Sequence, residues 1–420
     1  MKNIIHFSIV YFSIAACLML FTLPLRSQES DDEDYLKPGG ALRLNLVSQH
    51  YEEPYAPTST YATLDTWRLN VNAKYSGVLL DFEYRFYPTF NTHFIHHGFL
   101  GYRFTDDLEM QLGVTRVPFG NLDYNSNSWW FLIPYYIGLE DDYDMGIKFN
   151  YRATDKLDLS LAYFRQSDPA GPAYGSASFG GPGPGTYSYN IIPDNDGVVS
   201  ETGVPSSIRE MNQFNLRAEL DLAEYTQVGF SGQINGVYNS VLQQTDYGNA
   251  WAVHANANYY GFNLKVQFTS YNYKARDDEG NLLERVQMGA YGDPYYDDGV
   301  AARGDIITAA LAYDIPLQWG PISNIRPYFD YSIMTKEGSL VNGNNDFKFQ
   351  NSLMIVPGFM VTAGKVYTYV DFALGKNHPW LTDSFGTGLG AGHLDEEGKP
   401  LPLVELPWNL RFNINIGYYF

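Results

Sequence analysis

The sequence predicts an all-β protein, a transmembrane up-and-down antiparallel β-barrel of about 16 strands with an inward-folded third external loop. Residues Leu410 to Phe420 alternate strictly between an apolar and a polar face, and this ribbon ends on an aromatic residue. Segments with the same two-residue period recur along the chain. Because a barrel strand faces lipid on one side and water on the other, this period suits a barrel in a membrane.

The composition narrows the class. Aromatic residues make up 16% of the 420-residue chain, with 35 Tyr, yet the mean hydropathy is only −0.27. A barrel accounts for both values, because half of each strand is polar and tyrosines form girdles at the interfaces. Cys17 is the only cysteine, which excludes a disulfide framework, a thiolate metal site or a cysteine nucleophile in an exported chain. The net charge of −20 argues against a nucleic-acid partner.

The N-terminal region predicts export. Met1-Lys2 precedes a largely apolar run from Ile4 to Leu25 and a polar junction, which is typical of a secretory signal peptide over residues 1–27. A transmembrane anchor is the alternative, although no second apolar stretch of about 18 residues follows. We expect an acidic N-terminal segment over 28–40 and an outer-membrane barrel over 41–420. The terminal Phe420 resembles the signal that the barrel-assembly machinery recognises.

The alternation locates the strands in order. Trp67–Tyr75 presents one apolar face, turns at Ser76-Gly77 and returns through Leu80–Phe86, which predicts a hairpin. Further strands are predicted around 147–152, 157–163, 214–220, 251–259 and 262–268. Short connections are expected near 76, 105, 153, 222, 260, 314–323 and 357. Longer connections are expected near 51–61, 87–93, 117–142, 167–210, 239–249, 274–303, 335–346 and 377–406. Short periplasmic turns and long external loops produce this asymmetry in barrels.

Three stretches break the alternation, at 93–104, 347–356 and 359–375, where Asn351 and Lys365 fall on faces that should be apolar. Such breaks indicate a β-bulge or a subunit contact. They also leave open a count of about fourteen or eighteen strands. A soluble β-sandwich is the alternative fold, but it does not explain the signal peptide, the loop asymmetry and the aromatic terminus together.

The third long connection, Pro118 to Asp142, is rich in aromatic residues. We expect it to fold into the barrel and narrow the pore, since an aromatic loop is poorly suited to water. The alternative is an outward loop buried between other loops or against a neighbouring subunit. The residues predicted to form the constriction are Arg116, Pro118, Phe119, Gly120, Trp129, Trp130, Tyr135 and Tyr136.

The start of this connection carries a family signature. Residues Gly113 to Gly120, with the sequence Gly-Val-Thr-Arg-Val-Pro-Phe-Gly, resemble the Gly-x-x-Lys-x-Pro-Phe-Gly pattern of the phosphate-selective porin O/P family. Asp142 to Gly146 is similar to the strand that re-enters the barrel in that family. The resemblance implies a homotrimer of sixteen-stranded barrels that passes anions or other small solutes passively. Arg116 stands where Lys is usual, which preserves the charge.

The polar strand faces carry more cations than anions. If these faces line the lumen, about ten cations oppose about six anions there, and the lumen is net basic. The expected pore-lining cations are Arg43, Arg68, Lys74, Arg85, Lys148, Arg152, Arg217, Lys265, Arg326 and Arg411. The anions are Asp81, Glu83, Asp158, Glu219, Asp221 and Asp330. A basic pore attracts anions, so the pattern predicts an anion-preferring channel.

No catalytic, cofactor or metal site is predicted. His93, His96 and His97 lack a thiolate or an evident carboxylate partner in the sequence, and no Ser, His and acid group has the spacing of a hydrolase. Two other functions stay open. Trp129, Trp130, Tyr135 and Tyr136 could form a stacking track for sugars. Tyr291 to Asp298 could instead belong to a partner-binding surface on a barrel that serves only as an anchor. The expected partners are outer-membrane lipid, lipopolysaccharide, the assembly machinery and small anionic or neutral solutes.

Overall fold

The computed structural model describes residues 34–50, 59–122, 124–171, 185–192, 208–291, 293–342, 345–378 and 408–420. The predicted signal peptide over residues 1–27 lies outside these ranges, so its assignment stays a prediction. Among the described residues there is no helix of sufficient length and apolarity to cross a membrane.

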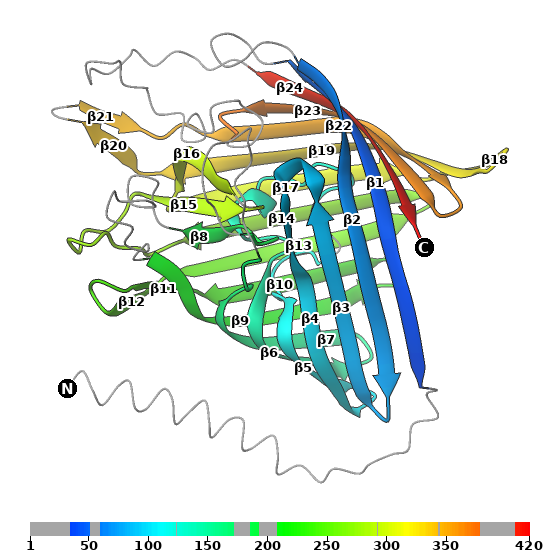
Figure 1. Ribbon diagram of the computed structural model, residues 1–420, viewed down its shortest axis with the longest axis horizontal. Helices are drawn as coiled ribbons and strands as arrows, with labels where there is room; N and C mark the ends of the chain where they lie inside the picture. Colours follow the sequence, from blue (N-terminus) through cyan, green and yellow to red (C-terminus); the bar gives the residue numbers. More distant parts are fainter. Residues whose placement is uncertain are drawn as a thin grey trace.

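Sixteen strands pair antiparallel in one closed ring, which confirms the predicted up-and-down barrel of about 16 strands. Figure 1 shows the last strand of this ring between its penultimate strand and the first one. In ring order the strands are β1 (Tyr35–His50), β2 (Ser59–Tyr75), β3 (Val78–Tyr87), β4 (Thr92–Thr105), β5 (Leu108–Arg116), β6 (Tyr143–Thr154), β7 (Leu157–Ser167), β9 (Ile208–Ala223), β10 (Thr226–Ile234), β13 (Asn249–Tyr259), β14 (Phe262–Asn272), β17 (Arg303–Tyr313), β19 (Ile322–Glu337), β22 (Ser352–Ala363), β23 (Val366–Lys376) and β24 (Asn409–Tyr419).

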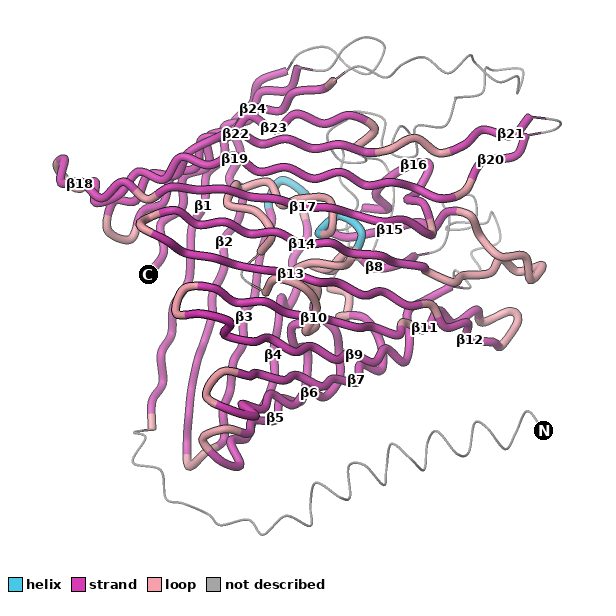
Figure 2. The backbone as a smooth tube through the Cα atoms, turned by 180° about the vertical axis from the view of Figure 1, so that it is seen from behind, coloured by secondary structure: helices cyan, strands magenta, loops and turns pink. Residues whose placement is uncertain are grey.

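Shorter strands and two 3-10 turns lie in the connections between the ring strands. A three-stranded sheet joins β8, β15 and β16, and β20 pairs with β21. Figure 2 shows the ring strands β13, β14, β17 and β19 side by side in one curved sheet. The remaining elements are β8 (Asn190–Ile192), β11 (Gly236–Asn239), β12 (Gln244–Tyr247), β15 (Arg285–Ala290), β16 (Asp293–Ala301), β18 (Ile315–Trp319), β20 (Ser339–Asn342), β21 (Asn345–Lys348) and two 3-10 turns, η1 (Pro88–Phe90) and η2 (Tyr135–Ile137).

The strands bury their polar faces and expose their apolar ones. In β1 the side chains of Leu42 and Leu44 are 43% and 50% exposed, whereas Arg43 and Asn45 are only 8% and 6% exposed. A soluble protein has the opposite arrangement, because water favours burial of apolar surface. The closed ring and its apolar exterior therefore define a transmembrane barrel, in which every strand pairs on both edges.

Local turn chemistry explains the short connections. Ser76 and Gly77 have φ values of 49° and 81°, and Tyr260 and Gly261 have values of 49° and 86°. Two consecutive residues with positive φ form the two-residue turn that matches the twist of a hairpin, and glycine at the second position adopts this conformation at little cost. Both turns lie where the sequence places them.

Two predicted boundaries are wrong. The first strand begins at Tyr35 rather than near Ala41. The expected short connection near 357 is absent, because β22 continues through Pro357, which pairs with Phe329 of β19 without a change of register. The chain turns instead after Ala363, so Lys365 belongs to a turn and not to a lipid-facing strand position.

The predicted irregularity in 93–104 is confirmed as a β-bulge. Glu83 of β3 lies opposite His97 of β4, whereas the next residue, Tyr84, lies opposite Ile95. His96 is therefore the additional residue of β4. A bulge re-aims neighbouring side chains, and here it brings two imidazoles close to the same carboxylate.

The C-terminal residue closes the ring. The Gly40 amide donates to the Phe420 carbonyl oxygen at 3.1 Å, and the Phe420 amide donates to the Gly40 carbonyl oxygen at 3.0 Å. A Cβ atom on Gly40 would lie 2.6 Å from the Phe420 ring. Glycine at this position thus lets the terminal aromatic ring pack directly on β1.

Deletion of Phe420 should slow insertion of the barrel, because it removes both hydrogen bonds to Gly40 and the terminal aromatic ring that packs on β1. We expect the variant to accumulate in the periplasm or to be degraded, as measured by membrane fractionation. Phe420→Tyr, which retains the ring and the backbone, should insert like the wild type. Wild-type amounts of inserted protein after the deletion would show that the residue is incidental.

Candidate functional site

The 117–142 segment connects β5 to β6 and hydrogen bonds to distant strands. The Gly120 amide donates to Ser231 Oγ of β10 at 3.0 Å, and the Asn121 amide donates to Gln267 Oε1 of β14 at 2.8 Å. Both acceptors are polar side chains of the buried strand face. The segment is therefore held by side chains that replace the water its backbone would otherwise need.

Two buried carboxylates hold the middle of this segment. Asp330 of β19 accepts the backbone amides of Asn127 at 2.8 Å and Ser128 at 2.7 Å. Asp371 of β23 accepts the Trp129 amide at 3.3 Å. In the ring β19 is separated from β5 by eight pairings in either direction, so these contacts join opposite walls. Asp330 was predicted as an anion of the polar strand face, and its carboxylate accepts these two backbone amides.

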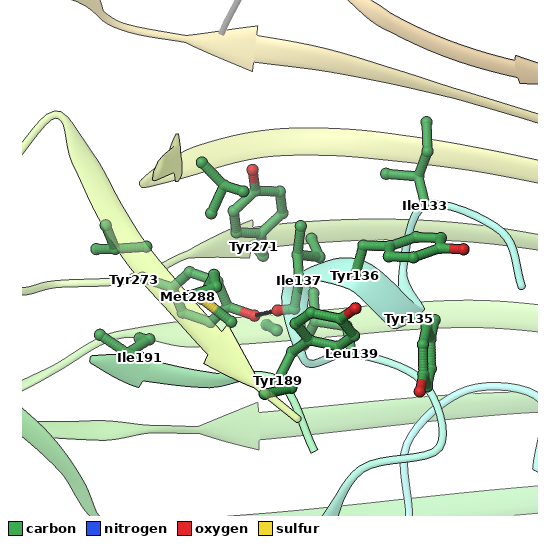
Figure 3. Close-up of a cluster of buried hydrophobic side chains, with 14 of the residues drawn as sticks. Ile133, Tyr135, Tyr136, Ile137, Leu139, Tyr189, Ile191, Tyr271, Tyr273 and Met288 are labelled. Atoms are coloured by element: carbon green, nitrogen blue, oxygen red, sulfur yellow. Dashed lines mark hydrogen bonds between the residues drawn. The ribbon is translucent and has the colours of Figure 1, made fainter. Parts of the chain in front are cut away.

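The end of the segment is packed among aromatic and aliphatic side chains. Figure 3 shows η2 beside Tyr189 and Met288, which come from later connections. Ile133 and Ile137 are fully buried, and the Tyr273 hydroxyl donates to the Ile137 carbonyl oxygen at 2.6 Å. The segment thus has its own apolar core, which limits the conformations open to it.

Glu140 is a buried carboxyl group within the segment. Its oxygens accept the Asn125 amide at 3.0 Å and the Asn125 side-chain nitrogen at 2.7 Å. Burial nevertheless raises the pKa of Glu140 to about 7, because desolvation disfavours the charged form. The folded protein therefore favours protonated Glu140.

This shift predicts a pH-dependent stability. Since the folded pKa lies above the ordinary value of 4.5, the contribution of Glu140 is full below that pH and is lost as the pH rises through about 7. The temperature at which the folded gel band converts to the unfolded band should fall between pH 5 and pH 8. Glu140→Gln imitates the protonated group, so its conversion temperature should fall less over this pH range. The control Glu279→Gln changes an exposed residue and should show the same fall as the wild type. Equal falls in all three proteins would contradict this assignment.

A cavity of about 490 Å³ lies between the strands and the 117–142 segment. Its lining contains six of the ten predicted pore cations and a single acid, Asp65, among the described residues. Trp129, Trp130, Tyr135 and Tyr136 of the segment also line it. The six cations are Arg43, Arg68, Arg85, Lys265, Arg326 and Arg411. The cavity therefore combines cationic and aromatic surface.

Guanidinium groups stack on the aromatic rings of the cavity. The Arg43 guanidinium carbon lies 4.1 Å from the ring centroid of Trp129, and that of Arg411 lies 5.4 Å from the ring of Trp130. Arg43 also lies 3.3 Å from Asp65. Stacking fixes the orientation of a guanidinium, and the edge of Arg43 also donates from Nη2 to Thr66 Oγ1 at 2.6 Å.

The other four predicted pore cations do not line this cavity. Lys74 is buried elsewhere on β2. Lys148 Nζ donates to the Arg116 carbonyl oxygen at 2.9 Å, and Arg217 Nε donates to the Gly120 carbonyl oxygen at 2.9 Å. Arg152 is the clearest departure from the prediction, because its side chain is 62% exposed beside Asp158 at the turn end of β6.

The predicted constriction residues also divide into two groups. Arg116 lies 3.0 Å from Asp141, and neither residue lines the cavity. Pro118, Phe119 and Gly120 are buried and likewise do not line it. The four aromatic residues of the segment do, so the sequence pattern located the aromatic part of the site better than the family signature did.

Several residues of the site were missed. Tyr187 and Tyr291, from later connections, line the cavity beside the predicted aromatic residues. Tyr291 is only 8% exposed and its ring lies 5.1 Å from that of Tyr87, so it does not offer the exposed partner surface considered from sequence. The many tyrosines in these connections were the available signal in the sequence. Composition does not predict which strands or segments their rings contact.

The bulge assembles groups that could bind a metal ion. Ligand atoms of Glu83, His96 and His97 lie within 4.8 Å of one another. Glu83 is thus the carboxylate partner of the histidines that was not evident in the sequence. His97 Nε2 also lies 3.1 Å from Asp81 Oδ1. However, Arg85 Nε donates to Glu83 Oε1 at 2.5 Å. This guanidinium already supplies the positive charge that a metal ion would bring.

The closed ring and its apolar exterior define a sixteen-stranded transmembrane β-barrel. No protein-family model and no curated protein matches the sequence. The fold is similar to an anion-selective porin from Comamonas acidovorans, with TM-score 0.54, 9% identity and coverage of 92% of this chain and 100% of that chain. It is also similar to OmpF of Salmonella typhi, with TM-score 0.54, 11% identity and coverage of 92% and 98%.

The outer-membrane channel DcaP of Acinetobacter baumannii gives a TM-score of 0.53 at 12% identity, over 94% of this chain and 99% of that chain. At such identities these likenesses show the fold alone. The specific likeness to phosphate-selective porins thus still depends on the short signature that ends at Gly120.

Proposed function

We propose that the barrel is a water-filled outer-membrane channel for passive diffusion of small solutes, with a preference for anions. The observation that carries this proposal is the cavity lining, in which six cations face a single acid among the described residues. A sixteen-stranded ring is wider than its side chains can fill, so a channel is the expected interior.

The local sign of charge supports the anion preference despite the net charge of −20. Charges beyond a Debye length of about 8 Å are largely screened, so loop carboxylates act weakly on an ion inside the barrel. Asp330 and Asp371 face inward but accept hydrogen bonds from the 117–142 segment. Their negative charge is thereby directed toward backbone donors rather than toward the permeating ion.

The 117–142 segment supplies the size limit in this proposal. Its hydrogen bonds to β10, β14, β19 and β23 support a path of the segment across the lumen. The narrowest passage would then have the aromatic rings of the segment on one side and the cationic strand wall on the other. Small hydrated anions could pass between the two surfaces.

Phosphate selectivity is the finer proposal, and it comes from the resemblance to phosphate-selective porins. The signature cation Arg116 is neutralised by Asp141 at 3.0 Å, so it contributes little to a phosphate site. Any phosphate preference would therefore depend on the six cations of the cavity. The resemblance also supports a homotrimer, which native mass measurement in detergent tests.

A sugar channel is the second candidate function. Trp129 and Trp130 line the cavity, and flat aromatic surfaces bind the apolar faces of sugar rings. Their stacking with Arg43 and Arg411 favours anionic or acidic sugars over neutral ones. Current block by acidic oligosaccharides such as oligogalacturonate, without block by phosphate, would favour this second function.

Recording of the purified protein in a planar bilayer tests the proposal. We expect stepwise, near-ohmic conductance from protein that shows the gel shift of a folded barrel. Folded protein without any conductance would overturn the channel and favour the anchor.

A further inference from the structure

Two exposed arginines differ from most other arginines of the chain. A typical arginine of this protein lies beside a carboxylate, as Arg303 does beside Glu284 at 2.7 Å. Within the part of the chain that the structure describes, Arg165 and Arg209 form no ion pair with a carboxylate, and both side chains are exposed. In a protein with a net charge of −20, two exposed cations without an acidic partner indicate a site for an external anion.

Both arginines point away from the barrel interior. Arg165 of β7 follows Phe164, which is fully buried, and Arg209 of β9 follows Ile208, which is only 8% exposed. Because neighbouring side chains of a strand point to opposite faces, the two arginines lie on the outer face. Figure 2 shows β7 and β9 side by side, so the arginines share one external surface.

The outer face changes character along these two strands. Leu161 lies opposite Leu216, and both are exposed. Two residues further along, Tyr163 lies opposite Phe214, and their ring centroids are 4.9 Å apart. Arg165 comes after two more residues and is the ninth residue of β7. A membrane-crossing strand needs about 9–11 residues, so Arg165 lies where the apolar band ends.

The arginines lie at the end of the barrel that carries the long connections. The chain leaves β7 through the 168–207 connection and returns in β9. Long connections are external in outer-membrane barrels, whereas short turns are periplasmic. The two arginines therefore face the outer leaflet.

A bulge in β9 holds Arg165 in place. Residues 211–213 of β9 lie against only two residues of the facing chain, 235–236. Asn212, with a φ of 60°, lies in this bulge, and its Oδ1 accepts the Tyr163 hydroxyl at 2.8 Å and Arg165 Nη1 at 2.6 Å. This hydrogen bond uses only one of the five N–H donors of the guanidinium, so the others are available to a ligand.

Arg209 is oriented by an aromatic ring. Its guanidinium carbon lies 5.3 Å from the ring centroid of Tyr238. Arg209 stands three residues beyond Asn212 on β9, a distance of roughly 10 Å along the strand. Two guanidinium groups at this spacing can contact two phosphate groups of one lipid headgroup.

We propose that Arg165 and Arg209, which we name the outer arginine pair, bind the phosphate groups of lipopolysaccharide in the outer leaflet. A guanidinium pairs with phosphate through two parallel hydrogen bonds. The pair also continues the apolar and aromatic face below it, so one lipid can contact the leucines with its acyl chains and the arginines with its headgroup. This inference rests on the outer-membrane location in the proposed function, but not on conduction.

Binding of fluorescently labelled diphosphoryl lipid A to the full-length folded protein in detergent tests the proposal. Fluorescence anisotropy at low salt should show saturable binding. Replacing Arg165 and Arg209 together with Gln should weaken it at least about tenfold, because each arginine near an anionic lipid surface adds to the binding. Arg152→Gln is the matched control, since it removes an exposed arginine beside Asp158 at the opposite end of the barrel, and it should bind like the wild type.

Each outcome decides the proposal. Loss of binding in the double Gln variant, together with weak binding of dephosphorylated lipid A to the wild type, supports it. Wild-type affinity in the double variant, or equal binding of dephosphorylated lipid A, overturns it and indicates that acyl chains alone hold the lipid. A lower native mass of the double variant in lipid-free detergent also overturns it, because the arginines would then contact a second copy of the chain.

Two features keep the test decisive. If the double Gln variant does not fold, Arg165→Lys with Arg209→Lys takes its place, with a smaller expected loss because the charges remain but the paired hydrogen bonds do not. The measurement needs no current recording. A protein that conducts without binding lipid A would therefore contradict only this inference and leave the channel proposal intact.

Discussion

Replacing Arg43, Arg68 and Arg411 together with Gln should shift the zero-current potential in a KCl gradient toward cation preference. All three line the cavity, where Arg43 lies 3.3 Å from Asp65 and Arg68 lies 3.5 Å from Glu83, so the triple change leaves these acids without their cations. A unit charge about 4 Å from an ion changes its energy by about 1 kcal/mol even in a water-like dielectric. That energy corresponds to roughly a fivefold change in partition, so we expect at least about a fivefold fall in the anion-to-cation permeability ratio.

Arg152→Gln is the matched control for charge. Its side chain is 62% exposed at the turn end of β6, outside the cavity. It should shift the zero-current potential little at low salt. An indifferent triple variant, or an equally large shift from Arg152→Gln, would mean that selectivity is set elsewhere in the barrel.

Asp330→Ala should release the middle of the 117–142 segment and raise single-channel conductance. The carboxylate is fully buried and accepts the backbone amides of Asn127 and Ser128. Bonds to a charged group are worth roughly 1.5–3 kcal/mol each, so the segment should lose several kcal/mol of local stability. Hydrogen exchange of both amides should accelerate accordingly.

Asp330→Asn keeps one acceptor oxygen and should have an intermediate effect on conductance. Asp158→Asn removes an acid whose side chain is 48% exposed, and it should change neither conductance nor exchange. Unchanged conductance in Asp330→Ala, despite accelerated exchange, would show that the segment does not limit the pore.

The strand pattern was predictable because lipid and water impose a period of two on each strand separately. The turn at Ser76-Gly77 was also predictable, because the conformation of a two-residue turn depends on its own residues. Pro357 misled the prediction because its lack of an amide hydrogen suggests a turn, yet the pairing on both sides of this residue keeps β22 continuous.

The site was predictable only in part. The aromatic residues near Trp129 were predictable because the segment is unusually rich in aromatic residues. The cations were predictable because they fall on the polar face of strands with a two-residue period. The roles of Asp330 and Asp371 depend on which backbone amides cross to their strands, and that depends on contacts between residues about 200 positions apart. The break in alternation at 93–104 indicated a bulge, but it does not say that His97 lies opposite Glu83, because that depends on the register between β3 and β4.

The zero-current potential of the wild-type protein tests the central claim most directly. Purified full-length protein in a planar bilayer, with a KCl gradient at low mean salt, should conduct and show the sign of an anion-preferring pore. A cation-preferring pore would contradict the claim that the cavity cations, rather than the net charge of −20, govern permeation.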